Sequence, residues 1–501
     1  MQTAPDTRLD ILPVKESSPR RRRRPRLAVH PAWIVPIGAC AMLVHLGLGL
    51  ALEGDVYWHL AAGQWMLGHH AVIRHDVFSY TVPGRPWLAE EWGFEVMLAW
   101  LVAHVGPVAF WWVAIVPSVG AMVVGFARWV RLGASPLWLA VVTVPAAGAL
   151  ALGVDVRPQV LSYMFFSAEL LILTLARRRT GWLAAIPPLM LVWANVHGSF
   201  LLGIVLLAME CVLALVFRAS GSAESPRSFG RVCVSQVLPL RATAGALAAT
   251  VAASLLNPHG PSLLTYALKV TASGRLSSII EEWQSPNFHS IPLLVIILGP
   301  ALLLLGALAL TSVRLELFDL VLWLGILVAS LHAIRFVPYL GIAFAGLAAP
   351  WPAFARGSLR PKLATIPLAA VLAGSLLVGS HPAAGAPQTH GADAIPVRAA
   401  AWVSHQRGRV FSTYLWNSYL IHLGVPVFVD GRTDMYFGTG VLTTYTKVES
   451  LTVNPDTVFD RWSVRFVLWP SSSALSEYLL HDPRWKVVMH DAPGLLFERR
   501  S

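Results

Sequence analysis

The chain alternates between long apolar runs and short polar segments. The first run, at about 31–52, follows an arginine-rich stretch. At about 20 residues it suits a membrane-spanning helix and exceeds the apolar part of a signal peptide. Similar runs continue to about residue 378. The pattern predicts a polytopic α-helical membrane protein.

The apolar stretch at 93–126 decides the number of spans. At about 34 residues it is longer than one span and barely long enough for two. One span at about 107–127 leaves 87–104 as an interfacial or re-entrant helix on the outer face. With the first run the spans then number about eleven, the others lying at about 107–127, 137–152, 160–176, 182–196, 200–217, 244–256, 291–310, 318–331, 337–349 and 366–378.

Basic residues gather on one side of this arrangement. Short cytoplasmic loops favour lysine and arginine, and the inner side collects Arg128, Arg131, Arg177, Arg178, Arg179, Arg218, Arg227, Arg231, Arg241, Arg314, Arg356, Arg360 and Lys362. We therefore expect a multi-pass protein of the bacterial cytoplasmic membrane with a cytoplasmic N-terminus. The expected parts are a disordered basic tail at 1–29, a transmembrane domain at 30–380 with a large first outer loop at 53–106, a linker at 381–397 and an extracytoplasmic domain at 398–501.

Composition agrees with this class. The 501 residues are 55% hydrophobic and 13% charged, whereas soluble proteins carry about 25% charged residues. The net charge of +11 would suggest nucleic acid on a soluble domain, but here it follows the membrane topology, so we expect no nucleic-acid partner. The three cysteines show no CxxC spacing, and we expect neither disulfides nor a metal cluster.

The last hundred residues have a different pattern. Short β-branched and aromatic runs alternate with helical stretches, which predicts a small α/β domain. The runs are 409–413, 425–429, 464–468, 485–490 and 495–499, with a hairpin around 491–494.

Unusual polar segments fall on the outer side. They lie at 53–59, 155–159, 193–198, 257–260, 281–283 and 332–335. Ionisable groups at membrane depth usually line a cavity or pathway, so these segments predict a shared outer pocket; helix capping at the interface is the alternative. The first outer loop has six carboxylates through Glu95 and many aromatic residues, and the spacing at 57–65 predicts an amphipathic helix in the interface plane.

Four segments resemble a bacterial group of GT-C-like membrane proteins: GDVYWHLAAGQWML, RHDVFSYTVPGRPWLAEEW, LVWANVHGSFLLG and VFVDGRTDMYFG. The layout also resembles the GT-C superfamily of membrane glycosyltransferases, with an acidic motif at 53–55 directly after the first span. The resemblance implies transfer of a sugar from a polyprenyl-phosphate donor to an unidentified acceptor at the outer face. Membrane lipid would be a further partner.

The resemblance also suggests residue roles. Asp55 is the candidate general base by position, with Glu53 second. Candidates for the donor phosphate are Arg157, Arg335, Lys269 and Arg275, because guanidinium and ammonium groups suit phosphate oxygens. Candidates for acceptor or sugar binding are Tyr57, Trp58, His59, Gln159, Asn195, His197, His259, Glu281, Glu282, Asp430 and Arg432.

The sequence departs from better-known members of the superfamily. A Trp-Trp-Asp acceptor motif is absent, and PWLAEEW at 86–92 replaces the His-Pro-Pro-Leu segment of aminoarabinose transferases, so donor and acceptor identity cannot be carried over. No cofactor is assigned. Asp55 with Glu281 or Glu282 could chelate a divalent metal, but these carboxylates suit acid–base roles or arginine partners equally well.

Two further questions stay open in the sequence. The segment 430–436 could cover the membrane pocket or grip acceptor, or it could be a turn with a local ion pair between Arg432 and Asp434. The alternatives to a transferase are a transporter or flippase for lipid-linked glycans, a surface-polysaccharide ligase or polymerase, and a catalytically silent scaffold.

Overall fold

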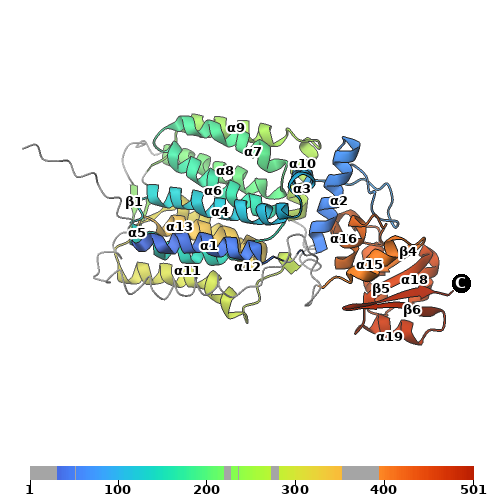
Figure 1. Cartoon of the computed structure of the whole chain (residues 1–501). Helices are drawn as coiled ribbons and strands as arrows, with labels where there is room; N and C mark the ends of the chain where they lie inside the picture. The colour runs from blue at the N-terminus through green and yellow to red at the C-terminus, as the bar shows by residue number, and fades with distance from the viewer. Residues whose placement is uncertain are drawn as a thin grey trace, which may run out of the picture.

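The computed structural model describes residues 31–50, 52, 54–218, 227–234, 236–271, 281–351 and 394–500. A bundle of long helices forms one part of the molecule and an α/β domain forms the other (Figure 1). Several sequence predictions lie outside the described residues: the tail at 1–29, Glu53, Arg275, the last span at 366–378 and most of the linker at 381–397.

The helices of the bundle follow the predicted apolar runs. In chain order they are η1 (Pro31–Trp33), α1 (Ile34–Leu48), α4 (Val108–Arg131), α5 (Pro136–Ala151), α6 (Gln159–Ala176), η2 (Thr180–Ala185), α7 (Ile186–Ala194), η3 (Gly198–Phe200), α8 (Leu201–Arg218), α9 (Leu240–Ser254), α11 (Ile291–Leu310), α12 (Leu317–His332), η5 (Ile334–Phe336) and α13 (Val337–Ala348). A bilayer offers no hydrogen bonds to the backbone, which is why spanning segments become helices.

Five described helical segments are long and apolar enough to cross a membrane. They are Pro31–Leu48, Val108–Arg131, Gln159–Ala176, Gly198–Phe217 and Ile291–Leu310. α11 leaves Leu302, Leu305 and Leu310 more than 60% exposed, which is a surface that hydrocarbon would cover. The chain is thus a multi-pass helical membrane protein, and the number of about eleven spans stays a prediction.

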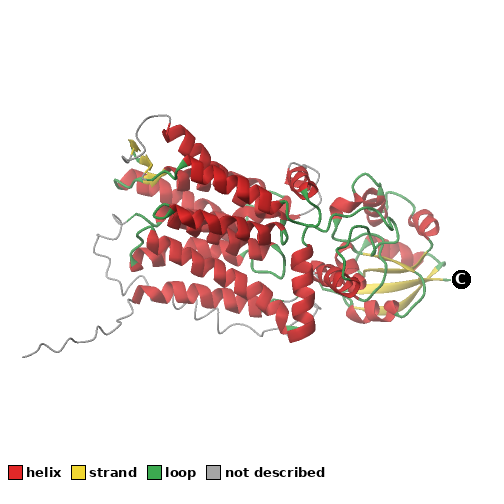
Figure 2. Cartoon of the chain, turned by 90° about the horizontal axis from the view of Figure 1, so that it is seen from above, coloured by secondary structure: helices red, strands yellow, loops and turns green. Residues whose placement is uncertain are grey.

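Shorter elements connect the helices of the bundle to one another. β1 (Arg227–Phe229), β2 (Val232–Val234) and β3 (Leu315–Glu316) form a small sheet. α10 (Pro261–Thr271) and η4 (Glu281–Trp283) lie among the segments between α9 and α11. Figure 2 shows strands at both ends of the molecule, with the helices between them.

The first outer loop contains α2 (Gly54–His69) and α3 (Trp92–Val105). The predicted helix at 57–65 is therefore present, but its first half is buried rather than lying freely in the interface plane. α2 stands between the bundle and the C-terminal domain (Figure 1), and Val56, Leu60 and Ala62 are at most 3% exposed. Packing on both sides fixes the helix that carries Asp55.

The C-terminal domain has the predicted α/β character. Its elements are α15 (Val397–Ser404), β4 (Arg409–Ser412), α16 (Tyr414–His422), η7 (Thr433–Tyr436), α17 (Val441–Glu449), α18 (Pro455–Trp462), β5 (Val464–Pro470), α19 (Ala474–His481), β6 (Trp485–Asp491) and β7 (Gly494–Arg499). The sheet order is β4-β5-β7-β6. β4 and β5 run parallel, and β7 pairs antiparallel with β5 and with β6.

One predicted strand, 425–429, is wrong. Within it only Val427 makes a bridge, and its partner is Ser79 of the first outer loop. The amide of Tyr80 donates to the carbonyl of Val427 (3.0 Å), and the amide of Val427 donates to the carbonyl of Phe78 (3.0 Å). These residues therefore attach the outer loop to the C-terminal domain instead of extending its sheet.

Candidate functional site

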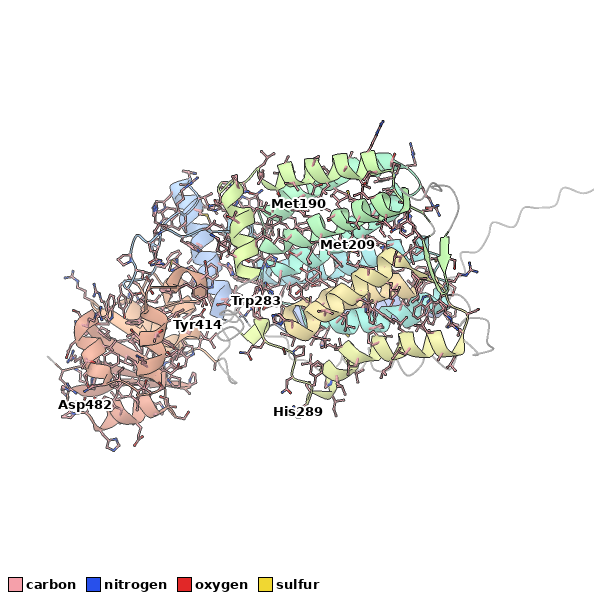
Figure 3. The ribbon with its side chains drawn as sticks, turned by 180° about the vertical axis from the view of Figure 1, so that it is seen from behind. Met190, Met209, Trp283, His289, Tyr414 and Asp482 are labelled. Atoms are coloured by element: carbon pink, nitrogen blue, oxygen red, sulfur yellow. The ribbon has the colours of Figure 1, made fainter. Side chains whose placement is uncertain are left out.

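A cavity of about 1490 Å³ lies where the bundle, the first outer loop and the C-terminal domain meet. Trp283 and Tyr414, which both line it, lie near this junction (Figure 3). Its walls come from the start of α2, residues 87–95, 157–159, 197–205, α10, 282–283, 334–339 and parts of 395–449. Five of the six polar segments singled out in the sequence thus contribute residues to one cavity.

Asp55 lies in the first turn of α2. Its Oδ2 is 3.6 Å from Nη2 of Arg157, and its Oδ1 accepts a hydrogen bond from Nε1 of Trp58 at 3.3 Å. The Asp55 side chain is 30% exposed, so its carboxylate can be reached from the cavity.

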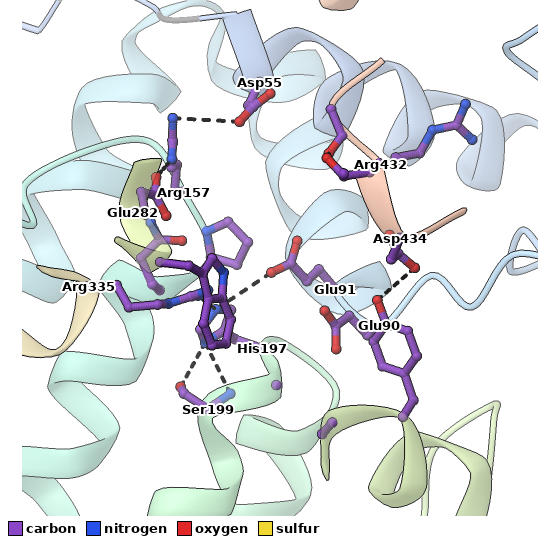
Figure 4. Close-up of a pocket in the computed structure, with 18 of the residues that line it drawn as sticks. Asp55, Glu90, Glu91, Arg157, His197, Ser199, Glu282, Arg335, Arg432 and Asp434 are labelled. Carbon is purple, nitrogen blue, oxygen red and sulfur yellow. Dashed lines mark hydrogen bonds and ion pairs between the residues drawn. The ribbon is translucent and has the colours of Figure 1, made fainter. Parts of the chain in front are cut away.

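Arg157 is surrounded by carboxylates. Its Nε lies 2.9 Å from Oδ2 of Asp155, its Nη1 pairs with Glu282, and its Nη2 faces Asp55. Figure 4 shows Arg157 between Asp55 and Glu282. Burial raises the pKa of Asp155, and Arg157 counteracts this rise. Three carboxylates therefore share the charge of this guanidinium.

Arg335 has different neighbours. Its guanidinium carbon lies 4.5 Å from the ring centre of Trp283, and its Nη2 lies 3.4 Å from Nε2 of His197. Within the described ranges no carboxylate forms an ion pair with Arg335. The guanidinium of Arg335 is thus positioned at the cavity wall by two neutral side chains, and it can therefore bind an anion in the cavity.

His197 is held in a neutral form. Burial, and then the charge of Arg335, lower its pKa to about 3. Nε2 of the neutral ring faces Arg335, and Nδ1 accepts a hydrogen bond from the backbone amide of Ser199 at 3.3 Å. Nδ1 is 2.7 Å from Oγ of Ser199 and 3.1 Å from Oγ of Ser162. This arrangement fixes the ring that supports Arg335.

A group of glutamates forms another wall of the cavity. Oε1 of Glu91 lies 3.7 Å from Nε2 of His197, and Oε2 lies 3.7 Å from Nε2 of His59. Nδ1 of His59 is 3.2 Å from Oε1 of Glu95. Burial raises the pKa of Glu91 well above its usual value, with Glu90 and Glu95 adding to the rise, and burial raises the pKa of Glu90 to about 8. Burial also lowers the pKa of His59, so this wall is largely uncharged near neutral pH.

The C-terminal domain contributes the 430–434 loop, which lies over the start of α2. Arg432 does not pair with Asp434 as the sequence suggested; its Nη2 lies 2.6 Å from Asp430 and 2.7 Å from Asp76. Asp434 instead accepts a hydrogen bond from the hydroxyl of Tyr266 in α10 at 2.8 Å. Arg432 prefers Asp76 because the outer loop packs directly against this loop, a long-range contact that local spacing cannot reveal.

The residues proposed from the sequence fall into three groups. Those that line the cavity are Asp55, Trp58, His59, Arg157, Gln159, His197, Glu282, Arg335 and Arg432. Those described but not lining it are Tyr57, Asn195, His259, Lys269 and Asp430. Glu53, Arg275 and the side chain of Glu281 lie outside what the structure describes.

The residues away from the cavity have other contacts. The Tyr57 ring packs 4.9 Å from that of Tyr419. Oδ1 of Asn195 accepts a hydrogen bond from Nε1 of Trp92, and Nε2 of His259 lies 3.1 Å from the carbonyl oxygen of Ala89. Lys269 is exposed.

Sequence reasoning did not single out several lining residues as site candidates. They are Glu90, Glu91, Glu95, Tyr266 and Tyr339. The pattern Glu90-Glu91-x-x-x-Glu95 directly before and inside an apolar helix was the available signal, because buried acids in such a context are costly unless they serve a site.

The cavity also has an apolar side. The apolar lining comes from α8, α9 and α10: Leu201, Leu202, Ile204, Val205, Val251, Leu264, Ala267 and Leu268.

Among the described residues, no group of three His, Cys, Asp or Glu side chains could hold a metal ion.

Comparison with known proteins supports a GT-C-like fold. No family model and no curated protein matches the sequence. The crystal structure of ArnT from Cupriavidus metallidurans bound to undecaprenyl phosphate is similar, with a TM-score of 0.53 and 14% identity over 93% of this chain and 97% of that one. The archaeal oligosaccharyltransferase AglB from Archaeoglobus fulgidus, in complex with an inhibitory peptide and a dolichol-phosphate, has a TM-score of 0.55 and 11% identity over 87% of this chain and 69% of that one. At these identities the comparison establishes the fold, which is GT-C-like.

Proposed function

We propose that this protein transfers a sugar from a polyprenyl-phosphate-linked donor to a hydroxyl-bearing acceptor at the outer face of the bacterial cytoplasmic membrane. The observation that carries the proposal is a single cavity that combines an arginine with no carboxylate partner among the described residues, an apolar side and an accessible aspartate. The similar structures of ArnT and AglB hold undecaprenyl phosphate and dolichol-phosphate, respectively.

The two ends of such a donor match two sides of the cavity. The apolar side chains of α8, α9 and α10 suit a polyprenyl tail, because hydrocarbon gains free energy by leaving polar surroundings. The phosphate would be bound by Arg335, which contacts Trp283 and His197 and forms no ion pair with a described carboxylate. Arg157, with three carboxylates around it, would orient Asp55 instead. Lys269 is exposed and does not line the cavity, so we do not propose it for phosphate binding.

In the proposed reaction Asp55 is the general base. The acceptor oxygen attacks the anomeric carbon, and its proton passes to the Asp55 carboxylate. The bond between the anomeric carbon and the phosphate oxygen breaks, and the electron pair leaves with the polyprenyl phosphate. Arg335 stabilises the charge that develops on that phosphate.

The experiment uses purified protein in lipid nanodiscs with undecaprenyl-phosphate donors that carry different radiolabelled sugars and membrane extract as acceptor. Release of undecaprenyl phosphate is measured, since it accompanies transfer to any acceptor. We expect Asp55→Asn to lower kcat about 100-fold or more and Arg335→Gln to raise the KM for the donor about 10-fold.

Arg465→Gln is the matched control, because Arg465 is half-exposed in the C-terminal domain and pairs with Glu498, and neither residue lines the cavity. It should turn over at the rate of the native protein. Absence of release with every donor would contradict the proposed function, and unchanged turnover in Asp55→Asn would remove Asp55 as its base.

A further inference from the structure

Gly431 lies directly against Asp55. A methyl group added at Gly431 would lie 2.6 Å from Oδ1 of Asp55 and 2.8 Å from Nε1 of Trp58. Cβ atoms in proteins essentially never approach another heavy atom to less than 3.0 Å in this way. The backbone φ of Gly431 is not positive, so an added methyl group would act by displacing the side chains of Asp55 and Trp58 and not by straining the backbone. The main chain of the C-terminal domain thus borders the candidate base.

The 430–434 loop that carries Gly431 is firmly held. Asp430 accepts hydrogen bonds from the backbone amide of Arg432 (3.0 Å), from its Nε (2.8 Å) and from the hydroxyl of Tyr436 (2.8 Å). Arg432 also bonds Asp76 of the first outer loop. Asp430 is 0% and Arg432 is 3% exposed. A paired and buried set of charges of this kind loses much stability if one member moves, so the loop cannot easily withdraw from Asp55.

The first turn of α2 is held from the same side. Oγ of Ser418 accepts a hydrogen bond from the backbone amide of Trp58 at 2.9 Å. A methyl group at Gly54 would lie 2.6 Å from the carbonyl oxygen of Leu415. The Asp55 carboxylate therefore lies between the loop of the C-terminal domain and Arg157 of the bundle.

We propose that Gly431 is a positioning residue, and that the 430–434 loop holds the carboxylate of Asp55 in the orientation that proton transfer requires. The inference rests on the proposed function and adds a role for the C-terminal domain in it. With the loop on one face and Arg157 on the other, the carboxylate has one open side, toward the cavity. Small errors in the placement of a reacting group cost up to about 100-fold in rate, so a close, rigid neighbour has a direct effect on kcat.

The kinetic test compares Gly431→Ala with Gly68→Ala. Both changes add one methyl group, but Gly68, which lies in α2 like Asp55, has no neighbour within 4 Å. We expect Gly431→Ala to lower kcat about 10- to 100-fold and to change the donor KM by less than about 2-fold, because Arg335 is not displaced. Gly68→Ala should behave like the native protein. A native kcat in Gly431→Ala would overturn the positioning role.

A second measurement tests the contact without turnover. The native cysteines Cys40, Cys211 and Cys233 are replaced by alanine, and Asp55→Cys is combined with Gly431→Cys and oxidised in nanodiscs. Because a disulfide requires neighbouring Cβ atoms, mass spectrometry should find the linked peptides, and should not find them when Gly68→Cys replaces Asp55→Cys. Absence of the link would overturn the inference. If the native protein transfers no sugar, the proposed function fails while the link still decides the contact.

Discussion

At the scale of single residues, Glu90 shows how burial controls the cavity. Burial raises its pKa to about 8, the nearby Asp434 adds to the rise, and Arg335 opposes it. Between its usual pKa near 4.3 and about 8, Glu90 keeps its proton in the folded state and loses it in the unfolded state. Since the folded state then binds more protons, the free energy of unfolding falls as pH rises through this interval.

We predict that Glu90→Gln weakens this dependence. Glutamine resembles the protonated carboxyl but cannot titrate, so the decrease in Tm between pH 5.5 and pH 8.5 should be a few degrees smaller than in the native protein. Differential scanning fluorimetry in detergent measures this slope. Glu477→Gln is the control, because Glu477 is 70% exposed on α19, and it should keep the native slope. A native slope in Glu90→Gln would show that Glu90 is ionised in the fold.

Residue types and positions indicated much of the cavity in advance. Asp55, Arg157, His197 and Arg335 stand at the ends of apolar runs on one predicted side, where ionisable groups are costly without a purpose, and all four line the cavity. The division between the two arginines could not be predicted. It depends on Glu282 pairing with Arg157 and on Trp283 packing against the guanidinium of Arg335, which are contacts between distant segments.

At the scale of elements, long apolar helices were the easiest to predict. α6 begins and ends within one residue of the predicted run at 160–176, because a bilayer requires a continuous apolar helix. α10 was not expected, since its polar and apolar residues mix over only eleven positions. The segment 425–429 had a strand-like composition, yet its hydrogen-bond partner is the first outer loop. Pairing partners, unlike local propensity, are a property of the tertiary fold.

Buried charges also connect helices at the end of the bundle away from the cavity. Nη2 of Arg128 in α4 lies 2.5 Å from Oδ1 of Asp319 in α12, and both side chains are 3% exposed. Nε of Arg128 donates to Oγ1 of Thr174 in α6 at 3.1 Å. One guanidinium thus joins three helices, which is a fixed arrangement suited to a scaffold for chemistry.

We predict that Asp319→Ala destabilises the bundle strongly. It leaves the buried guanidinium of Arg128 without its carboxylate, which costs about 3–5 kcal/mol, whereas replacing both partners by apolar residues costs much less. The free energy of unfolding in mixed detergent micelles should therefore be lower for Asp319→Ala than for Arg128→Met combined with Asp319→Leu. Equal losses in the two variants would contradict the role given to this ion pair.

At the scale of the whole molecule, the helical bundle and the C-terminal α/β domain contact each other, and the sequence pattern of neither part predicts this contact. The sequence predicted a helical membrane domain and a C-terminal α/β domain from their different periodicities. It left open whether the 430–434 loop reaches the membrane pocket. Gly431 and Asp55 are separated by hundreds of residues, so their contact follows from the docking of α16 on α2 and of the first outer loop on the C-terminal domain.

The same two-part arrangement predicts which side of the membrane each part faces. Thr180 begins η2, directly after the arginine-rich turn that follows α6, and Ser471 lies in the C-terminal domain; both are exposed. Because short arginine-rich loops stay in the cytoplasm, we expect a membrane-impermeant maleimide to label Ser471→Cys in intact spheroplasts and Thr180→Cys only after permeabilisation, with the native cysteines replaced. Labelling is read as a mass shift on a gel. Labelling of Thr180→Cys in intact spheroplasts would reverse the orientation and place the cavity, with Asp55 and Arg335, on the cytoplasmic side, where an outer-face transfer reaction could not occur.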